Sequence, residues 1–237
     1  NKEGGEWDQY ALIFDQHHKT DGDLLRQIFY DPAMLQLIGN TSGKVVLDAG
    51  SGNGYFTQKL ATQADQVIGI DASPNMVSIS QARNQHPNVQ YLQANLLESV
   101  PLANGVVDLI VSNLVLQYLP SLDRAASEFA RVIGESGKVA VGIEHPMVNV
   151  IYRTQELLGT RRDNDFEHAV DYFDNVPTTR RTLQGQARVT VFNRTLTDYM
   201  LPFFQNGFSL TQILEPEITK SVAQLHPTYQ RIQHGAR

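Results

Sequence analysis

A buried strand that runs directly into a glycine-rich turn is the feature that most constrains the fold of this chain. Residues 45–54 read Val-Val-Leu-Asp-Ala-Gly-Ser-Gly-Asn-Gly, and a helical pattern follows them. Glycine is needed in such a turn because the backbone must bend with little steric cost and let a ligand approach without an intervening Cβ. The pattern indicates the first strand, turn and helix of a nucleotide-binding α/β fold.

Short β-branched apolar runs alternate with helical patterns along the middle of the chain, which is typical of βα units and a sheet buried on both faces. The expected strands are Lys44–Ala49, Gln66–Ile70, Val89–Gln93, Val106–Ser112 and Lys138–Glu144. The expected helices are Thr57–Gln63, Asn75–Asn84 and Ser121–Ile133, with Ser73 as an N-cap and Pro74 at a first helical position. One domain is expected, because a single core stays efficient up to about 250 residues.

Two segments lie outside this alternation, and each is a candidate lid over the cofactor-binding core at residues 43–145. Residues 1–40 form a helical arm, with an amphipathic stripe and a second helix around Leu24–Ile38; the stripe consists of Trp7, Tyr10, Ala11 and Phe14. Residues 146–187 form a polar, arginine-containing insertion after the fifth strand.

Residues 188–237 form the C-terminal part of the expected domain. Strands are expected at Arg188–Phe192, Phe208–Leu214 and near Thr228–Gln233, with a helix at Leu196–Gln205 and Gly207 as its C-cap. The prediction is therefore a Rossmann-like, mostly parallel seven-stranded sheet with helices on both faces.

Composition and charge argue against several classes of function. The net charge of -6 creates no field that would concentrate nucleic acid. Cysteine is absent, which removes disulfides and thiolate metal sites, and the scattered histidines predict no catalytic metal. The most apolar run, Leu109–Leu119, is shorter than the about 20 residues of a membrane span. We expect a cytoplasmic monomer or homodimer that acts on a small molecule without nucleic acid or membrane.

The spacing of the glycines separates the possible ligands. Gly50, Gly52 and Gly54 lie two positions apart, whereas dinucleotide sites use G-x-G-x-x-G and a P-loop requires a following Gly-Lys-Ser/Thr. Asp48 precedes the glycines. Asp71 ends the second expected strand, where a carboxylate can accept hydrogen bonds from both hydroxyls of a ribose.

These residues resemble the four-part signature of class I S-adenosylmethionine-dependent methyltransferases, most closely the type 11, ubiquinone-biosynthesis-type, small-molecule group. The four parts are Asp48–Gly54, Asp71, Val107–Asn113 and Arg131–Lys138. The resemblance covers residues 43–144 well, and residues 193–216 also look like the C-terminal pattern of the group. It implies S-adenosylmethionine as the methyl donor and S-adenosylhomocysteine as the product.

The resemblance also implies a set of cofactor contacts. The glycine loop would support the methionine and ribose portions, Asp71 would hold the ribose hydroxyls, and Met76 would pack on the adenine. Asn95 stands where the family usually has an aspartate that bonds the adenine amino group, and it keeps an acceptor oxygen. The residues expected at the cofactor are Asp48, Gly50, Ser51, Gly52, Gly54, Asp71, Ala72, Met76, Asn95, Leu96, Ser112, Asn113 and Leu114.

Methyl transfer from a sulfonium is an in-line displacement, so much of the acceleration can come from holding donor and acceptor together. A base is needed only where the acceptor is protonated. The catalytic candidates are His145 at the end of the fifth strand, Tyr10 and His18. Tyr10 is included because a tyrosine of this arm often faces the cofactor carboxylate in the methyltransferases that the chain resembles. The candidate acceptor-binding residues are Arg180, Arg194 and Tyr152. Each set has a structural alternative. His145 could simply end a strand, His18 could lie at a solvated helix end, and the arginines could form surface salt bridges.

Two other functions stay open at this point. A nicotinamide-dependent oxidoreductase would need the longer glycine spacing. A protein that binds the cofactor without turnover is compatible with Asn95 and with Asn193, which stands where family members often carry a histidine. Turnover with any acceptor would exclude this second alternative.

Overall fold

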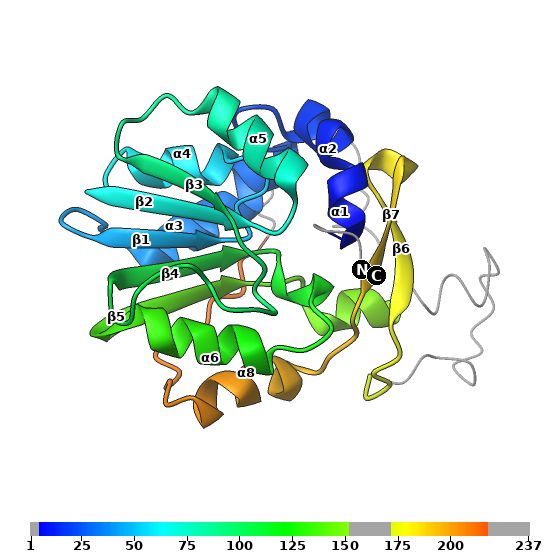
Figure 1. Cartoon of the computed structure of the whole chain (residues 1–237). Helices are drawn as coiled ribbons and strands as arrows, with labels where there is room; N and C mark the ends of the chain where they lie inside the picture. The colour runs from blue at the N-terminus through cyan, green and yellow to red at the C-terminus, as the bar shows by residue number, and fades with distance from the viewer. Residues whose placement is uncertain (1–4, 152–171, 218–237) are drawn as a thin grey trace, which may run out of the picture.

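A five-stranded parallel sheet forms the centre of the computed structural model, which describes residues 5–151 and 172–217 (Figure 1). The strands are β1 Val45–Ala49, β2 Gln66–Asp71, β3 Val89–Gln93, β4 Val107–Asn113 and β5 Ile133–Gly142. Their order is β3-β2-β1-β4-β5, and every pair is parallel. The order reverses between β1 and β4, so their carboxyl ends form the switch point at which open α/β sheets bind ligands.

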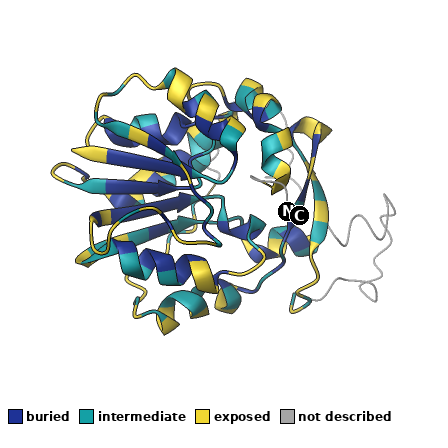
Figure 2. Ribbon diagram, viewed as in Figure 1, coloured by how far each residue is buried: buried dark blue, intermediate teal, exposed yellow. Residues whose placement is uncertain are grey.

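Helices cover both faces of the sheet, as expected (Figure 1). Helices α3 Asp31–Ile38 and α4 Tyr55–Ala61 pack on one face, and α5 Pro74–Arg83 lies along β2 and β3. Helices α6 Asp123–Val132 and α8 Leu196–Gln205 lie on the other face. The three inner strands, β1, β2 and β4, are the most buried part of the sheet (Figure 2). Both of their faces are covered, so these strands are largely apolar on both sides, whereas the edge strands β3 and β5 are partly exposed and carry polar residues.

The expected strands are confirmed with small shifts at their ends. The largest shift is in β5, which begins at Ile133 and ends at Gly142 instead of running from Lys138 to Glu144. Its pairing with β4 shifts register between Val107 and Leu109. The irregular start of β5 escaped prediction because the glycines of residues 133–138 break the apolar pattern. Ser73 is the N-cap of α5, as expected, and its hydroxyl accepts the Met76 N–H at 3.1 Å.

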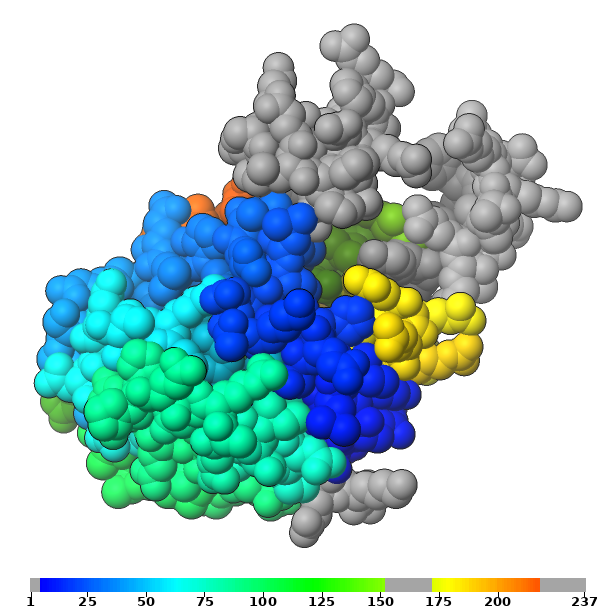
Figure 3. All heavy atoms as spheres, turned by 90° about the horizontal axis from the view of Figure 1, so that it is seen from above, coloured from blue at the N-terminus to red at the C-terminus, as the bar shows by residue number. Residues whose placement is uncertain are grey.

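The N-terminal arm contains two short helices in place of one continuous helix. Helix α1 spans Gly5–Gln9 and α2 spans Ala11–His18, because Tyr10 between them leaves the helical conformation. The second expected helix, around Leu24–Ile38, is confirmed: residues 24–38 are helical without a break, with a π-helical stretch at Arg26–Tyr30 that leads directly into α3. Figure 3 shows the arm in dark blue, between the helices on the cyan and green side and the yellow hairpin.

The hairpin consists of β6 Thr178–Thr182 and β7 Ala187–Val191, which form a separate antiparallel sheet. The strand expected at Arg188–Phe192 is therefore present as β7. It pairs with β6, which lies within the expected insertion, and it is not part of the central sheet. The prediction of strand Phe208–Leu214 is wrong, since the structure assigns no strand there. Leu210 is 53% exposed, so it lacks the burial that a neighbouring strand would give it.

The seven-stranded sheet is not confirmed: the described residues place five strands in it. The strand expected near Thr228–Gln233 lies outside those residues. Helix α8 is confirmed, and it begins with a capping box between Thr195 and Asp198. It ends at Gln205 as expected, but its C-cap is Asn206, one residue before the expected Gly207. The φ of +87° at Gly207 allows the N–H groups of residues 207 and 208 to bond the last carbonyls.

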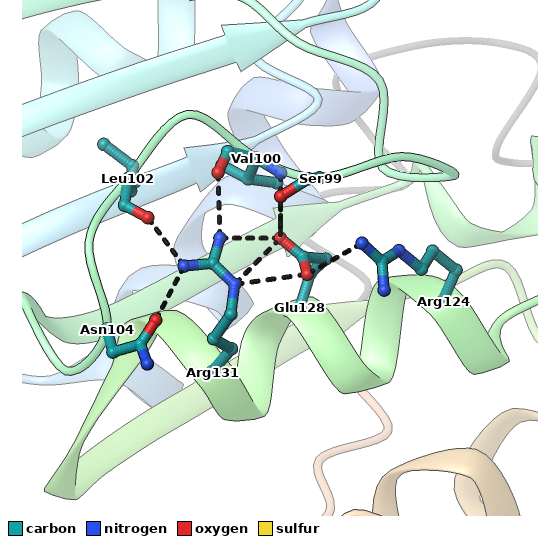
Figure 4. Close-up of polar contacts among 7 residues, drawn as sticks. All are labelled: Ser99, Val100, Leu102, Asn104, Arg124, Glu128 and Arg131. Atoms are coloured by element: carbon teal, nitrogen blue, oxygen red, sulfur yellow. Dashed lines mark hydrogen bonds and ion pairs between the residues drawn. The ribbon is translucent and has the colours of Figure 1, made fainter.

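A buried carboxylate on α6 fixes the loop between β3 and β4 (Figure 4). Glu128 is 2% exposed, accepts the Val100 N–H at 2.8 Å and pairs with Arg131 at 2.7 Å. Arg131 also donates to the carbonyls of Val100 and Leu102 at 2.8 and 2.7 Å. The hydrogen bond from Arg131 lowers the pKa of Glu128. The signature segment that begins at Arg131 thus has a structural role in holding this loop on α6.

Among the described residues, no helix is both long and apolar enough to cross a membrane.

Candidate active site

The glycine loop between β1 and α4 requires glycine for conformation and for space. Gly50, Gly52 and Gly54 have φ angles of +89°, +55° and +81°. A Cβ on Gly50 would lie 2.4 Å from Val115 Cγ2, and one on Gly54 would lie 2.5 Å from Tyr91 Oη. The N–H groups of residues 50 and 51 donate to the carbonyl of residue 70 at 2.8 and 2.9 Å, which holds the loop against the end of β2.

Asp71 joins this loop to α5. One carboxylate oxygen accepts the Gly52 N–H at 2.9 Å, and the other accepts the Ser73 N–H at 2.9 Å. Burial raises the pKa of Asp71. A carboxylate offers about four lone-pair sites, so Asp71 keeps capacity for a further donor beside these N–H groups. The geometry therefore suits a carboxylate that accepts bonds from two neighbouring hydroxyl groups.

Asp48 lies beneath the loop and is only 3% exposed. Its Oδ2 accepts the Thr57 hydroxyl at 2.6 Å, which ties β1 to α4. Burial raises the pKa of Asp48 to about 7. These contacts favour a role in supporting the loop over a direct side-chain contact with a cofactor.

The expected adenine-side residues cluster after β2 and β3. Met76 is 2% exposed and packs with Phe14 of the arm, and Leu96 is 5% exposed. The Asn95 side-chain oxygen already accepts the Leu97 N–H at 3.0 Å, so an adenine amino group would share it. The carbonyl of Ala72 accepts the Gln93 amide at 3.4 Å.

The end of β4 is strained and contains buried polar atoms without partners. Leu114 has a φ of +61°, and its N–H donates to the Gly142 carbonyl at 2.7 Å. Such a conformation costs a non-glycine residue roughly 1–3 kcal/mol and is frequent at ligand sites. Within the described residues, the Oδ1 atom of Asn113 and the Oγ atom of Ser51 are buried without a hydrogen bond. Both residues belong to the expected cofactor set, and a bound ligand would satisfy such atoms.

Ser112 is fully buried, like Ile110 and Val111 before it in β4. Its hydroxyl donates to the Ala49 carbonyl at 3.2 Å and so joins β4 to β1. Only its backbone could approach a ligand at this edge of the sheet.

Two of the three catalytic candidates, Tyr10 and His18, pack at the arm cluster that contains Phe14, whereas His145 lies beside Glu215. His18 is 3% exposed, its Nδ1 bonds the Phe14 carbonyl at 2.8 Å, and its Nε2 lies 3.3 Å from Asp23. Both ring nitrogens are engaged, which favours a packing role. The His145 side chain is 43% exposed, and its Nε2 lies 3.8 Å from a Glu215 oxygen. Tyr10 is half-buried and packs against the hydrophobic cluster around Phe14.

Arg180 joins the hairpin to the carboxyl end of β5. It forms a two-pronged pair with Glu144, in which Nη2 lies 3.2 Å from Oε1, and both side chains are 20% exposed. Burial and then the charge of Glu144 raise the pKa of Tyr118 and the pKa of Tyr30, the latter to about 12. The charge of Glu144 therefore acts on the aromatic side chains at this edge of the sheet.

Arg194 ties the C-terminal region to the turn after β4. It donates to the carbonyls of Leu116 and Leu119, and its guanidinium lies 5.7 Å from the ring centroids of Phe192 and Tyr199. Its donors are committed to the backbone, which favours a structural role. Tyr152 lies outside the described residues. Those residues contain no group of three metal-ligating side chains.

Sequence reasoning missed the acidic residues by which the arm docks. Asp15 pairs with Arg83 of α5 at 2.5 Å and accepts the side-chain amide of Asn53, from the glycine loop, at 2.9 Å. Asp8 contacts the start of α5, 65 positions along the chain from Ser73. No local pattern marks such contacts, because acidic residues on a short amphipathic helix are usually solvated.

Comparison with known proteins agrees with this geometry. Residues 47–141 match the family model of the type 11 "Methyltransferase domain". Over 164 residues the chain is 35% identical to a malonyl-(acyl-carrier protein) O-methyltransferase of Pectobacterium atrosepticum, covering 68% of this chain and 58% of that protein. Over 135 residues it is 34% identical to the Yersinia pestis protein of the same name, covering 56% and 49%. A solved structure assigned as an S-adenosylmethionine-dependent methyltransferase from Listeria monocytogenes superposes with a TM-score of 0.71 at 26% identity, covering 86% of this chain and 90% of that one.

The strand order and the glycine loop held by Asp71 define the class I S-adenosylmethionine-dependent methyltransferase fold. The chain is a member of this class, and its core matches the type 11 methyltransferase domain. It spans 58% and 49% of the lengths of the two curated relatives named above.

Proposed function

We propose that this chain transfers the methyl group of S-adenosylmethionine to a small-molecule acceptor. The observation that carries the proposal is the fixed junction of the glycine loop and Asp71, whose oxygens are anchored by two N–H groups and keep lone pairs for a ribose. The cofactor supplies a methyl group that is already activated on sulfur. The protein then needs to hold donor and acceptor in line, and orientation of this kind is worth effective molarities of about 10⁵–10⁸ M.

The cofactor would lie along the carboxyl edge of the sheet. Asp71 would accept from the ribose hydroxyls, Met76 and Leu96 would border the adenine, and Asn95 would accept from its amino group. At the methionine end, the two buried unpaired oxygens of Ser51 and Asn113 would receive donors. These buried, unpaired oxygens support the fit of a ligand with polar groups at this end.

On the acceptor side, we propose a carboxylate as the group that is methylated. Arg180 holds a carboxylate, that of Glu144, in a two-pronged pair at this edge of the sheet, and an acceptor carboxylate could exchange with it. A carboxylate is ionised at neutral pH and needs no base, so the exposed position of His145 is compatible with turnover. The two curated relatives, named as O-methyltransferases of a malonyl group, support this choice.

We further propose a single domain, in which the arm at 1–40 and the insertion at 146–187 close over the core at 43–145 and the region 188–237 completes it. It would act in the cytoplasm as a monomer or homodimer, without nucleic acid. The net charge of -6 supports the exclusion of polyanionic substrates.

Isothermal titration with S-adenosylhomocysteine tests the cofactor site. We expect micromolar binding to the wild type and at least about 100-fold weaker binding to Asp71→Ala, because charge-assisted hydrogen bonds of about 1.5–3 kcal/mol each are lost. NAD and NADP are the controls. Unchanged binding by Asp71→Ala, or binding of a nicotinamide instead, would overturn the proposal.

Transfer of a labelled methyl group tests the acceptor. The panel contains a malonyl thioester of an acyl-carrier protein, free dicarboxylic acids, and phenols and amines as controls. Labelled esters are the expected product, and label in the phenols or amines alone would refute a carboxylate acceptor. Binding of the cofactor without turnover of any acceptor would favour a binding protein that lacks catalysis.

A further inference from the structure

Asp8 of α1 lies at the N-terminus of α5, the helix that follows Asp71. Its Oδ1 accepts the Ser73 hydroxyl at 2.6 Å and the Asn75 N–H at 3.0 Å. Its Oδ2 accepts the Asn75 side-chain amide at 3.1 Å. Asp8 therefore satisfies an otherwise unbonded N–H in the first turn of a ten-residue helix, from a segment far away in the sequence.

Ser73 connects Asp8 to the carboxylate that is expected to hold the ribose. The Ser73 N–H donates to one oxygen of Asp71, while its hydroxyl donates to Asp8 and accepts the Met76 N–H. The other Asp71 oxygen accepts the Gly52 N–H. The N–H and the hydroxyl of Ser73 are thus both hydrogen-bonded. The hydroxyl is held by Asp8, so a displacement of Asp8 would displace Ser73.

Helix α1 is held on its other side by the hairpin. Glu6, two residues before Asp8, accepts the backbone N–H of Thr190 at 2.5 Å and its hydroxyl at 2.8 Å. One short helix therefore contacts both the start of α5 and strand β7, which agrees with the position of the arm in Figure 3.

We infer that Asp8 is a positioning residue for the cofactor, which holds Asp71, through Ser73, in the orientation that accepts both ribose hydroxyls. The inference rests on the proposed function, because it concerns the same cofactor site.

The charge of Asp8 gives this role a specific signature. The carboxylates of Asp8 on α1 and Asp48 on β1 face Asp71, and after burial the charge of Asp8 raises the pKa of Asp71. Ribose binding uses the ionised form of Asp71, so affinity falls as the pH drops through that pKa. Removing the charge of Asp8 lowers the pKa of Asp71, and the affinity should then persist to lower pH.

The experiment is titration of the full chain with S-adenosylhomocysteine between pH 5 and pH 9. Asp8→Ala removes the acceptor oxygens, and we expect binding about tenfold weaker at pH 8. Asp8→Asn keeps an acceptor oxygen without the charge. We expect its affinity at pH 8 to stay within about threefold of the wild type, and its loss of affinity on acidification to begin at lower pH. Asp21→Asn, which removes an exposed charge in the turn after α2, is the matched control.

Thermal unfolding of each variant establishes that it is folded. Wild-type affinity in Asp8→Ala, or an unmoved pH dependence in Asp8→Asn, would overturn the inference. A wild type that fails to bind S-adenosylhomocysteine would instead refute the proposed function, so the two failures are distinguishable.

Discussion

Asp48 should make the protein less stable as the pH rises, and the substitution Asp48→Asn should remove this dependence. The carboxyl is 3% exposed and accepts one hydroxyl bond from Thr57, so burial raises its pKa from 3.8 to about 7. The folded state therefore holds this proton in a pH range where the unfolded chain has released it. Stability contributed by the neutral form is present below pH 3.8 and is lost as the pH rises to about 7.

The size of the effect follows from the change in pKa. The full rise corresponds to about 4 kcal/mol of unfolding free energy, of which about 3 kcal/mol is lost between pH 5 and pH 8. Asn has nearly the shape of Asp and keeps an oxygen for the Thr57 hydroxyl, but it does not ionise. Asp48→Asn should therefore gain about 3 kcal/mol relative to the wild type between these two pH values.

Urea unfolding at pH 5 and pH 8, without cofactor, measures this difference. All other titratable groups are common to the two proteins. Their contribution therefore cancels when the unfolding free energy of the wild type is subtracted from that of the variant. Asp108→Asn, the same substitution at an exposed carboxylate that accepts the Val45 N–H, controls for the change itself. If the stability difference between Asp48→Asn and the wild type is the same at both pH values, Asp48 does not bind its proton in the folded state and the reasoning is refuted.

Two further predictions concern the clamp on α6 and the glycine loop. Glu128→Ala leaves Arg131 without its buried partner and should cost about 3 kcal/mol in urea unfolding at pH 7. Because the pKa of Glu128 is lowered from 4.5, that loss should shrink as the pH falls below this value. Gly54→Ala should destabilise the protein more than Gly39→Ala and should abolish binding of S-adenosylhomocysteine. Both glycines have a positive φ, but only at Gly54 would an added Cβ clash with a neighbour, Tyr91. Equal thermal shifts for the two glycine variants would contradict the steric argument.

The central sheet and its helices were predictable because their signals are local. β-Branched runs indicate strands, and the N-cap Ser73 lies within the segment it caps. The glycine loop and Asp71 were equally predictable, since positive φ angles and a short connection leave few residue types that fit.

Tertiary structure alone decided how the outlying segments pair. Strand β7 joins β6 rather than the central sheet, because strand pairing depends on the partner that is available and not on apolar pattern. His18 becomes buried by stacking on Phe14, and Asp8 reaches Ser73 across 65 positions. The sequence around a polar side chain does not indicate whether that side chain will be exposed to solvent. It also does not indicate which distant group will form a hydrogen bond with it. The sequence by itself therefore determined the βα core and the glycine loop, while folding decided which distant groups the residues of the arm and hairpin contact.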